Sequence, residues 1–233
     1  MVLVASGPHG SGNASGSLGP DTYSHNRFGQ YVRNRTKPIN TNTARQQVIR
    51  AALSQLTARW SQVLTAGQRT AWNLYGSNVV MKNKLGQDML LTGFNHYLRS
   101  NVPRLSIAAA PIDAGPVVFE LPEQDPTYAV TASEATQVLT LAYDATRAWA
   151  TETGGYLFHY QGMPQNAQRN FFGGPWRLVG MTSGVDGAPP ASPDLLGVQF
   201  AIAELQRGWV YARIARVDGR ISAPFRGDCY VGA

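Results

Sequence analysis

The side chains that could act in acid–base or metal chemistry are few and widely separated in this sequence. The four histidines are His9, His25, His96 and His159. No two of them have the HxH or HExxH spacing that brings imidazoles onto one metal ion. We therefore interpret His9 as a solvated residue and the other three as structural residues.

The usual nucleophiles and phosphate-binding loops are also missing from the sequence. A lone cysteine, Cys229, allows neither an intrachain disulfide nor a cysteine zinc cluster, and we interpret it as a small core residue. No GxSxG motif occurs, and the glycine-rich runs 7–12 and 174–180 lack the Lys-Ser/Thr ending of a P-loop. The acids of 120–126 have no second cluster to act with. We predict a protein that is not an enzyme and uses no metal or cofactor.

The composition is that of a folded protein with little surface charge. Hydrophobic residues make up 43% of the 233 positions and charged residues only 15%, against about 25% in typical soluble domains. The net charge of +6 hides a split, because residues 1–104 carry twelve lysines and arginines but two acids. Residues 105–233 carry eight arginines and twelve acids. A basic half and an acidic half favour contacts with other proteins or with further copies of the chain.

Nucleic-acid binding is an alternative role for the basic half, since lysine and arginine neutralise phosphates. However, no zinc-finger spacing, RNP motif or basic zipper is present to read bases. A membrane span is not expected, because no run of about 18 apolar residues occurs. The first residues also lack the charged start and long apolar core of a signal peptide.

Residues 1–42 are predicted to form a flexible arm followed by a basic hairpin. Gly, Ser and Asn dominate positions 1–20, which bury too little apolar surface to become ordered without a partner. A hairpin turn is expected at 26–29, and the alternation after it predicts a strand with a basic, aromatic-ended face. The residues predicted to dock onto a partner here are Tyr31, Arg33, Arg35 and Lys37. The alternative is an ordinary hairpin that packs on the chain's own helices.

Residues 43–104 are predicted to form a small helical docking module. Apolar residues recur there at spacings of three to four over about five turns. These residues are Val48, Ile49, Ala52, Leu53, Leu56, Trp60, Val63 and Leu64. Capping boxes are expected at Thr43 with Gln46 and at Thr65 with Gln68.

The later part of this module has weaker signals. We expect a helix C-cap at Gly76 and a loop over 78–90. A third helix is predicted to begin at Thr92 and to stop before Pro103.

An Ala/Pro/Gly linker is predicted at 105–116, followed by an all-β domain at 117–233. Short apolar runs separated by Gly, Pro, Asp and Asn have the spacing of a β-sandwich. The predicted strands are Val117–Leu121, Tyr128–Ala132, Val138–Tyr143, Gly155–Gln161, Trp176–Thr182, Val198–Ala201, Trp209–Val217 and Arg220–Pro224. Asp218-Gly219 is the best hairpin signal. The run 209–224 resembles the last two strands of an immunoglobulin-like or fibronectin-III-like module, so the predicted fold class is α+β.

An aromatic and arginine-containing loop spans 160–176. Phe171, Phe172 and Trp176 lie there beside Gly and Pro. These rings are predicted either to anchor an interface or to plug one end of the sandwich. A carbohydrate-binding module is a further alternative, in which Trp149, Trp176 or Trp209 would form a platform for sugars.

The stretch 28–76 resembles a segment of uncharacterised phage and prophage structural proteins. Their pattern is a basic YVRNRxKP hairpin followed by an LTxxQRxxW helix. The first part corresponds here to residues 31–38, with Arg45 and Gln46 further on, and the second to residues 64–72. Thr41 stands where a proline is common in those proteins. The resemblance covers about a fifth of the chain and implies a virion setting without implying a catalytic activity.

The residues and the resemblance together predict a non-enzymatic virion protein. We expect it to dock through its basic N-terminal half, with Arg45 among the docking residues, and to project a β-sandwich. A head decoration or minor capsid role is expected first, and a tail, connector or baseplate role second. The expected partners are other virion proteins and further copies of the chain, with DNA contact as an alternative for the basic half.

Overall fold

The computed structural model describes residues 2–5, 13–37, 39–83 and 85–233. The chain divides into two compact units, Met1–Ala44 and Arg45–Ala233. The two units are described separately below. The predicted stretch around His9 lies outside the described residues.

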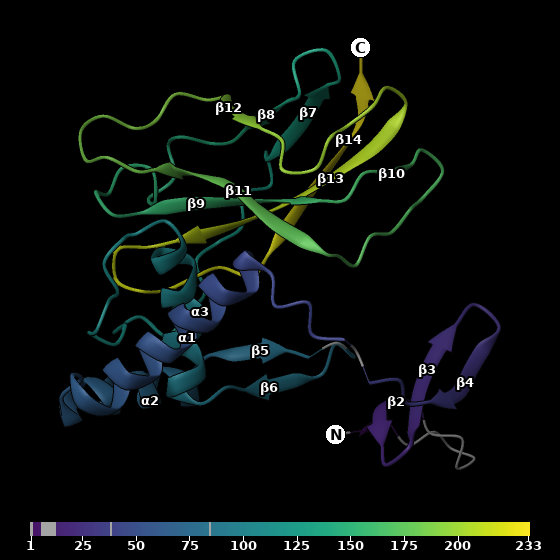
Figure 1. Cartoon of the computed structure of the whole chain (residues 1–233). Coiled ribbons are helices and arrows are strands. Elements are labelled where there is room, and N and C mark those ends of the chain that lie inside the picture. The colour runs from purple at the N-terminus through teal and green to yellow at the C-terminus, as the bar shows by residue number, and fades with distance from the viewer. Residues whose placement is uncertain (1, 6–12, 38, 84) are drawn as a thin grey trace. The chain divides into compact units, whose positions relative to one another are not determined.

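The first unit is an antiparallel sheet in which successive strands are neighbours (purple in Figure 1). Its described strands are β1 (Val2–Ala5), β2 (Asn13–Leu18), β3 (Asp21–Asn26) and β4 (Gly29–Asn34). The hairpin predicted at 26–29 is confirmed, because Asn26 pairs with Gly29 across a two-residue turn. Gly29 has a φ of +121°, which favours glycine at this turn.

The expectation that residues 1–20 lack regular structure is wrong for β1 and β2. Their residues carry no hydrophobic alternation, but β2 pairs with both β1 and β3. Neighbouring strands therefore supply the backbone hydrogen bonds that a local sequence pattern does not predict.

The second unit begins with the predicted helices, which lie on one side of a larger sheet (Figure 1). The described helices are α1 (Ala44–Gln62), α2 (Ala66–Asn78) and α3 (Gly93–Ser106). The capping box at Thr65 is confirmed: its hydroxyl accepts from the Gln68 amide at 3.2 Å, and the Gln68 side chain accepts from the Thr65 amide at 2.8 Å. Thr92 caps α3 as predicted.

Two predicted helix ends are wrong. Gly76 is inside α2, which ends at a Val79 cap. The glycine is needed for packing instead, because a Cβ there would lie 2.6 Å from the Leu91 carbonyl oxygen. Helix α3 continues through Pro103, which is itself buried. Proline removes one backbone donor, but the next residue, Arg104, binds two carbonyls of the sheet and holds the last turn in place.

The segment 78–90, expected to be a loop, instead contains a short hairpin. Its strands are β5 (Val80–Lys82) and β6 (Asp88–Leu90), with Met81 opposite Met89. Between the two strands, the Asn83 carboxamide oxygen accepts from the backbone amides of Leu85 and Gln87, at 2.8 and 3.0 Å.

The larger sheet has eight described strands in the order β11-β9-β13-β14-β7-β8-β12, with β10 beside β13. These are β7 (Ala129–Ser133), β8 (Val138–Ala142), β9 (Tyr156–Gly162), β10 (Gln165–Asn166), β11 (Trp176–Ser183), β12 (Asp194–Gly197), β13 (Gln206–Ala215) and β14 (Phe225–Gly232). β14 and β7 pair in parallel, whereas the other neighbours are antiparallel.

The sheet curls until its two ends meet, which makes it sandwich-like. β11 and β12 stand at opposite ends of the strand order. Nevertheless, the Thr182 hydroxyl on β11 donates to an Asp194 carboxylate oxygen on β12 at 2.8 Å. A Cβ on Gly180 would lie 3.1 Å from the Leu196 side chain. The curl encloses one apolar core, whose members include Leu139, Leu141, Leu157 and Val210.

Most of the predicted β-strands are confirmed. The predictions that match observed strands are Tyr128–Ala132, Val138–Tyr143, Gly155–Gln161, Trp176–Thr182 and Trp209–Val217. The turn at Asp218-Gly219 is also present, with Gly219 at a φ of +93° and the Arg216 amide donating to the Arg220 carbonyl.

Three predicted strands are wrong, and three observed strands of the large sheet were not predicted. Val117–Leu121 and Val198–Ala201 form no strand, and of Arg220–Pro224 only Ile221 makes an isolated bridge, to Ala215. β10, β12 and β14 were not predicted. β14 reads FRGDCYVG with alternate residues exposed, so its strand signal is weak although it pairs with two neighbours.

The segment 105–116, predicted as a linker, is packed inside the second unit. Asp113 accepts from the Arg59 guanidinium at 2.7 and 2.6 Å, and its carbonyl accepts from the Trp72 indole at 2.9 Å. The compact units divide near residue 44 instead, so the helices and the large sheet belong to one unit.

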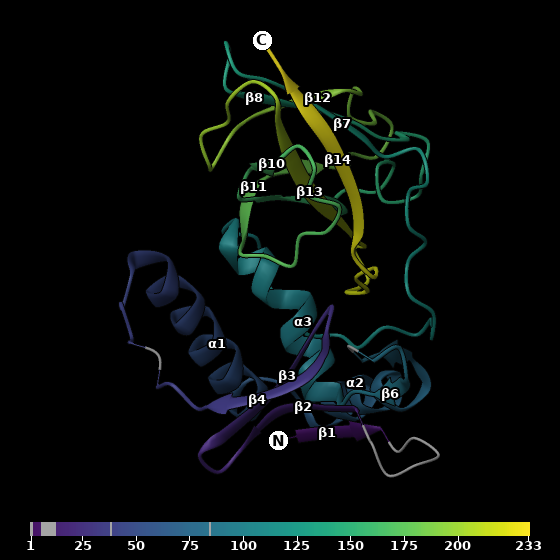
Figure 2. The ribbon, with the colours of Figure 1, turned by 90° about the vertical axis from the view of Figure 1, so that its right-hand side faces the viewer.

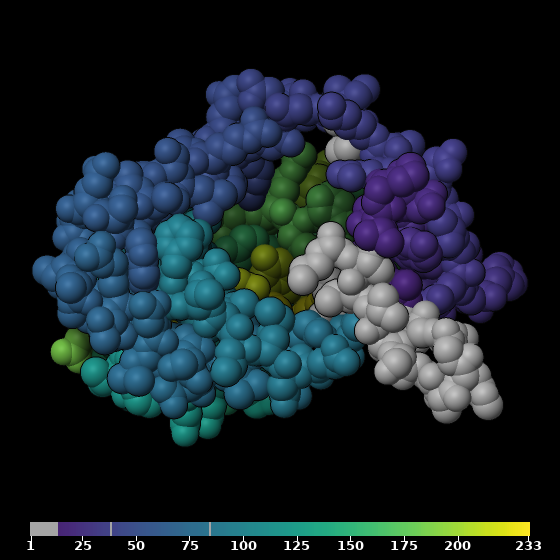
Figure 3. Space-filling view, turned by 90° about the horizontal axis from the view of Figure 1, so that it is seen from below, coloured from purple at the N-terminus to yellow at the C-terminus, as the bar shows by residue number. Residues whose placement is uncertain are grey.

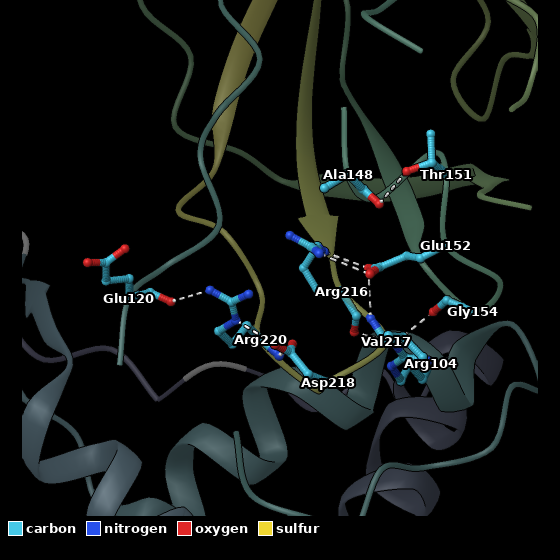
Figure 4. Close-up of polar contacts among 10 residues, drawn as sticks. All are labelled: Arg104, Glu120, Ala148, Thr151, Glu152, Gly154, Arg216, Val217, Asp218 and Arg220. Atoms are coloured by element: carbon cyan, nitrogen blue, oxygen red, sulfur yellow. Dashed lines mark hydrogen bonds and ion pairs between the residues drawn. The ribbon is translucent and has the colours of Figure 1, made fainter. Parts of the chain in front are cut away.

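Arginine side chains join the helices to the sheet. Arg104 of α3 donates to the carbonyls of Gly154 and Arg216, at 3.0 and 2.8 Å. Arg216 in turn forms a bidentate ion pair with Glu152, as Figure 4 shows. Arg99 binds the carbonyls at 221 and 222 at 2.7 Å each. Figure 2 shows α3 running from the helical layer up to the sheet.

Candidate protein interface

Buried polar side chains form a chain of hydrogen bonds across the sheet core. The Tyr128 hydroxyl and the Thr182 hydroxyl each lie 3.0 Å from a ring nitrogen of His159, and Thr182 donates onward to Asp194. His159 is completely buried. Burial lowers the pKa of His159 to about 4, so the ring is neutral at pH 7. These hydrogen bonds join His159 of β9 to Thr182 of β11, and Thr182 to Asp194 of β12.

His96 is also completely buried, but its environment differs. Neither ring nitrogen has a hydrogen-bond partner among the described residues, and the same holds for the Tyr75 hydroxyl. The two rings meet edge to face at 5.0 Å. Burial and the nearby charge of Arg99 lower the pKa of His96 to about 4. No solvent-facing acid–base group is formed here.

The remaining candidates for chemistry are also in packed surroundings. Burial raises the pKa of the Cys229 thiol to about 11, so it is not an activated thiolate. No group of three metal-ligating side chains is found in the part of the chain that the structure describes. Trp149 and Trp209 are 1% and 6% exposed, which leaves only Trp176 of the three proposed sugar platforms partly exposed.

Two shallow clefts meet at Arg147, at one side of the large sheet. They have volumes of about 410 and 610 Å³ and share Glu123 and Arg147 in their linings. The Arg147 guanidinium lies 3.6–3.7 Å from Asp125 and Asp144. Asp125 also accepts three hydrogen bonds from neighbouring residues. The Arg147 charge is therefore paired within the fold.

The predicted docking hairpin is exposed. Tyr31 is 41% exposed, and Arg33, Arg35 and Lys37 are exposed as well. Strand pairing places Tyr31 beside Ser24 and Arg33 beside Thr22, so one face carries hydroxyl and guanidinium groups. No side chain between residues 14 and 44, Pro38 aside, is buried.

The opposite face of the hairpin is more apolar. Tyr23 pairs there with Val32, which is 56% exposed, and Leu18 opposite Asp21 is 64% exposed. A free-standing sheet with a solvated apolar face is only marginally stable in water. The first unit therefore has the properties of a segment that gains stability by packing against something else.

The second group of predicted site residues lies on the outer face of the large sheet. Phe172 and Trp176 meet edge to face at 5.0 Å, and Phe171 is 67% exposed. Gly162 on β9 makes this packing possible, because a Cβ there would lie 2.4 Å from the Phe172 ring. Of the two predicted roles, Phe172 fits the plug and Phe171 fits the exposed anchor.

Further tyrosines and arginines on the same outer face were not predicted from the sequence. The Tyr160 and Tyr211 rings are stacked at 4.4 Å, and Trp176 meets Tyr211 at 4.9 Å. Arg226 lies directly opposite Tyr211 in the strand register, and Arg213 is two residues further along β13. We call Tyr160, Tyr211, Arg213 and Arg226 the arginine–tyrosine face. Its two tyrosines and Arg213 alternate outward in β9 and β13, which the sequence did predict, whereas Arg226 lies on β14, which it did not.

The cations of this face are not neutralised within the fold. Arg213 and Arg226 form no ion pair with any described residue, and the Nε of Arg213 is buried without a hydrogen-bond acceptor. By contrast, Arg207 on the same strand is paired with Asp228 at 2.6 Å. The outer face therefore combines exposed aromatic area with unpaired positive charge, which is a composition enriched at protein interfaces.

Arg45, the remaining predicted docking residue, begins the second unit in the first turn of α1. Its charge acts on the Tyr160 hydroxyl, whose pKa is raised by burial and lowered by Arg213 and Arg45. The structure thus brings Arg45 close to the arginine–tyrosine face. The hairpin residues Tyr31 and Arg33 belong to the other unit.

No protein-family profile, curated protein or solved structure matches this chain. Among the described residues, no helix is long and apolar enough to cross a lipid bilayer.

Proposed function

We propose that this chain is a non-enzymatic structural protein of a phage virion, which assembles through its N-terminal sheet and the outer face of its large sheet. The observation that carries the proposal is the first unit, where exposed apolar and basic side chains lie on a sheet without a buried residue between positions 14 and 44, Pro38 aside. Such a segment gains its packing from a partner and gives area and specificity to assembly.

The virion setting rests on the hairpin and helix motifs at 31–38 and 64–72, which resemble those of phage structural proteins. The hairpin motif is exposed, as a docking element must be. Its Arg33 and the following Arg35 present charge to a partner, while Trp72 of the helix motif is a fully buried core residue. A head decoration or minor capsid role is the first candidate, and a tail, connector or baseplate role the second.

The large sheet is proposed to project from the particle as an immunoglobulin-like or fibronectin-III-like module. Support comes from its sandwich-like curl and from the tight turn at Asp218-Gly219 in the stretch that resembles such modules. Mixed sheets with one parallel pair, as at Val231 with Ala132, are common.

The test substitutes the exposed hairpin face without removing any buried side chain. A Tyr31→Ser/Arg33→Glu double variant is expected to lose incorporation into particles, measured by mass spectrometry of purified particles, while its melting curve stays unchanged. A Val63→Ser/Arg69→Glu variant changes charge equally in the helical module and serves as the control. Normal incorporation of the hairpin variant would refute docking through this face.

Nucleic-acid packaging is a second candidate, favoured by Arg213 and Arg226, which form no ion pair with any described residue. It predicts that binding of the full chain to duplex DNA falls steeply as salt rises, because phosphate contacts release counterions. Undetectable DNA binding at low salt would remove this candidate and leave the protein-assembly role.

A further inference from the structure

The arginine–tyrosine face presents hydrogen-bond donors, of which one Arg226 nitrogen has an acceptor among the described residues, the Phe172 carbonyl at 3.2 Å. Guanidinium groups can only donate, and Arg213 and Arg226 have no carboxylate partner among the described residues. The Tyr160 and Tyr211 hydroxyls form no hydrogen bond within that part of the chain either. Guanidinium groups without a carboxylate partner, beside hydroxyls that can also donate, are complementary to an oxyanion.

The geometry holds these donors in place. Strand register sets Tyr160, Tyr211 and Arg226 side by side across β9, β13 and β14. The Arg213 guanidinium lies 5.9 Å from the Tyr211 ring, and that of Arg226 lies 5.5 Å from the Trp176 ring. Aromatic rings beneath the cations restrict their rotamers, so less entropy is lost when they bind.

An exposed apolar stripe runs along α1, the helix whose first turn holds Arg45. Val48, Ile49 and Leu53 are 55%, 37% and 38% exposed, and their spacing continues the buried stripe that ends in Leu56. Figure 3 shows the hollow between blue α1 and the green residues of the sheet. Arg45, in the first turn of α1, lies close enough to Tyr160 of the sheet for its charge to lower the pKa of that hydroxyl. The helix with these exposed apolar side chains therefore lies near the cations of the sheet.

We infer that this hollow binds a segment of another protein that carries both carboxylates and apolar side chains. The carboxylates would meet Arg213 and Arg226, and the apolar side chains would cover Val48 and Ile49. This inference rests on the proposed assembly function. It names the chemistry of the partner that binds the outer face of the large sheet, one of the two surfaces proposed for assembly.

The same observations favour a protein segment over single-stranded nucleic acid. Nucleic acid binds by stacking bases on open aromatic faces. Here Tyr160 and Tyr211 are stacked on each other, with planes 9° apart, and Trp176 meets Tyr211 edge-on. A phosphate backbone would also leave the apolar stripe of α1 uncovered.

The test uses the full chain and labelled probes of known composition. A peptide of leucine and glutamate is compared with the same peptide carrying glutamine for glutamate, and with oligothymidylate, by fluorescence anisotropy at low salt. We expect the glutamate peptide to bind at least about tenfold more tightly than the glutamine peptide, because charge-assisted pairs supply the difference. Equal affinities, absence of peptide binding, or preference for oligothymidylate would overturn the inference.

Variants locate the binding on the face. Arg213→Gln is expected to weaken binding of the glutamate peptide about tenfold. Arg213→Lys should weaken this binding less, and Val48→Ser should weaken it severalfold. Arg69→Gln on α2 makes the same charge change away from the hollow and should leave binding unchanged, with melting curves checking the fold of each variant. Equal weakening by Arg69→Gln would show nonspecific attraction and refute the site. Particle incorporation depends on the intact hairpin, so it tests the proposed function separately from this inference.

Discussion

His96 and His159 are both fully buried, yet only His159 has hydrogen-bond partners. An unsatisfied buried polar group costs about 1–3 kcal/mol, whereas a satisfied one contributes to stability. The same residue type therefore has opposite effects at the two positions. This difference depends on neighbours that are distant in the sequence, such as Tyr128 for His159.

Replacing each histidine by leucine should show this difference at pH 7. His96→Leu is expected to keep or raise the free energy of unfolding, by about 1 kcal/mol, because it removes two unpaired nitrogens. His159→Leu is expected to lower it by about 2–3 kcal/mol, because the Tyr128 and Thr182 hydroxyls lose their partner. Urea unfolding measures both. Equal losses in the two variants would contradict the assignment.

The two histidines also predict acid lability. Burial lowers both pKa values to about 4, below the ordinary value near 6.5, so the unfolded chain binds protons more readily. The contribution of the two neutral histidines to the free energy of unfolding is therefore fully present above about pH 6.5 and is lost as the pH drops toward 4. The loss reaches about 3 kcal/mol per histidine, at about 1.4 kcal/mol per pKa unit. His96→Leu should reduce the slope of the unfolding midpoint between pH 6.5 and 4, and an unchanged slope would rule this out.

Asp113 is a second residue whose role depends on the fold. It binds Arg59 through two hydrogen bonds and lies 3.4 Å from the Tyr97 hydroxyl. Asp113→Asn is expected to lower the free energy of unfolding by about 1–2 kcal/mol, because a partly buried bidentate pair is lost. Asp88→Asn breaks the exposed pair with Lys82 and should change it by less than about 0.5 kcal/mol. Thermal unfolding of the two variants side by side tests this contrast.

At the scale of elements, the loop between β10 and β11 depends on one glycine of β9. Gly162→Ala would place a methyl group 2.4 Å from the Phe172 ring and displace the loop, with an expected loss of about 1–3 kcal/mol. Gly197→Ala on β12 meets nothing within 4 Å and serves as the matched control. Melting temperatures measure the loss, and the Leu/Glu peptide reports on the neighbouring face. Equal melting of the two variants would exclude this packing role.

The helices illustrate which elements local sequence can predict. The capping box at Thr65 and the start of α3 at Thr92 involve residues three positions apart, so the sequence shows them directly. The continuation of α3 through Pro103 depends on Arg104, which donates to the carbonyls of Gly154 and Arg216, more than 40 residues away in the sequence. Such contacts leave no local pattern.

At the scale of the whole molecule, the two units are expected to separate on limited proteolysis. Residues 39–43 form no helix or strand and are exposed, and trypsin-sensitive Arg35 and Arg45 flank them. We predict early cleavage after Arg35, with residues 36–233 surviving as a fragment that keeps the second unit folded, because the cores of that unit contain no residue of the first unit. Mass spectrometry of the digest identifies the cut. First cleavage within 163–175 would contradict the prediction.

The sequence by itself determined the hairpin at 26–29, the helices and most strands of the large sheet, because each depends on spacings within a few residues. It also placed Phe171, Phe172 and Trp176 at a candidate site. The arginine–tyrosine face was decided only by the tertiary structure, since Tyr160, Tyr211 and Arg226 become neighbours through strand pairing across 66 positions of sequence. Likewise, Thr182 meets Asp194 only because the sheet curls. The 105–116 segment is held in place only by tertiary contacts, such as the hydrogen bond from the Trp72 indole to the Asp113 carbonyl. Nonlocal contacts of this kind follow from the burial of the whole apolar core, which no short window of sequence contains.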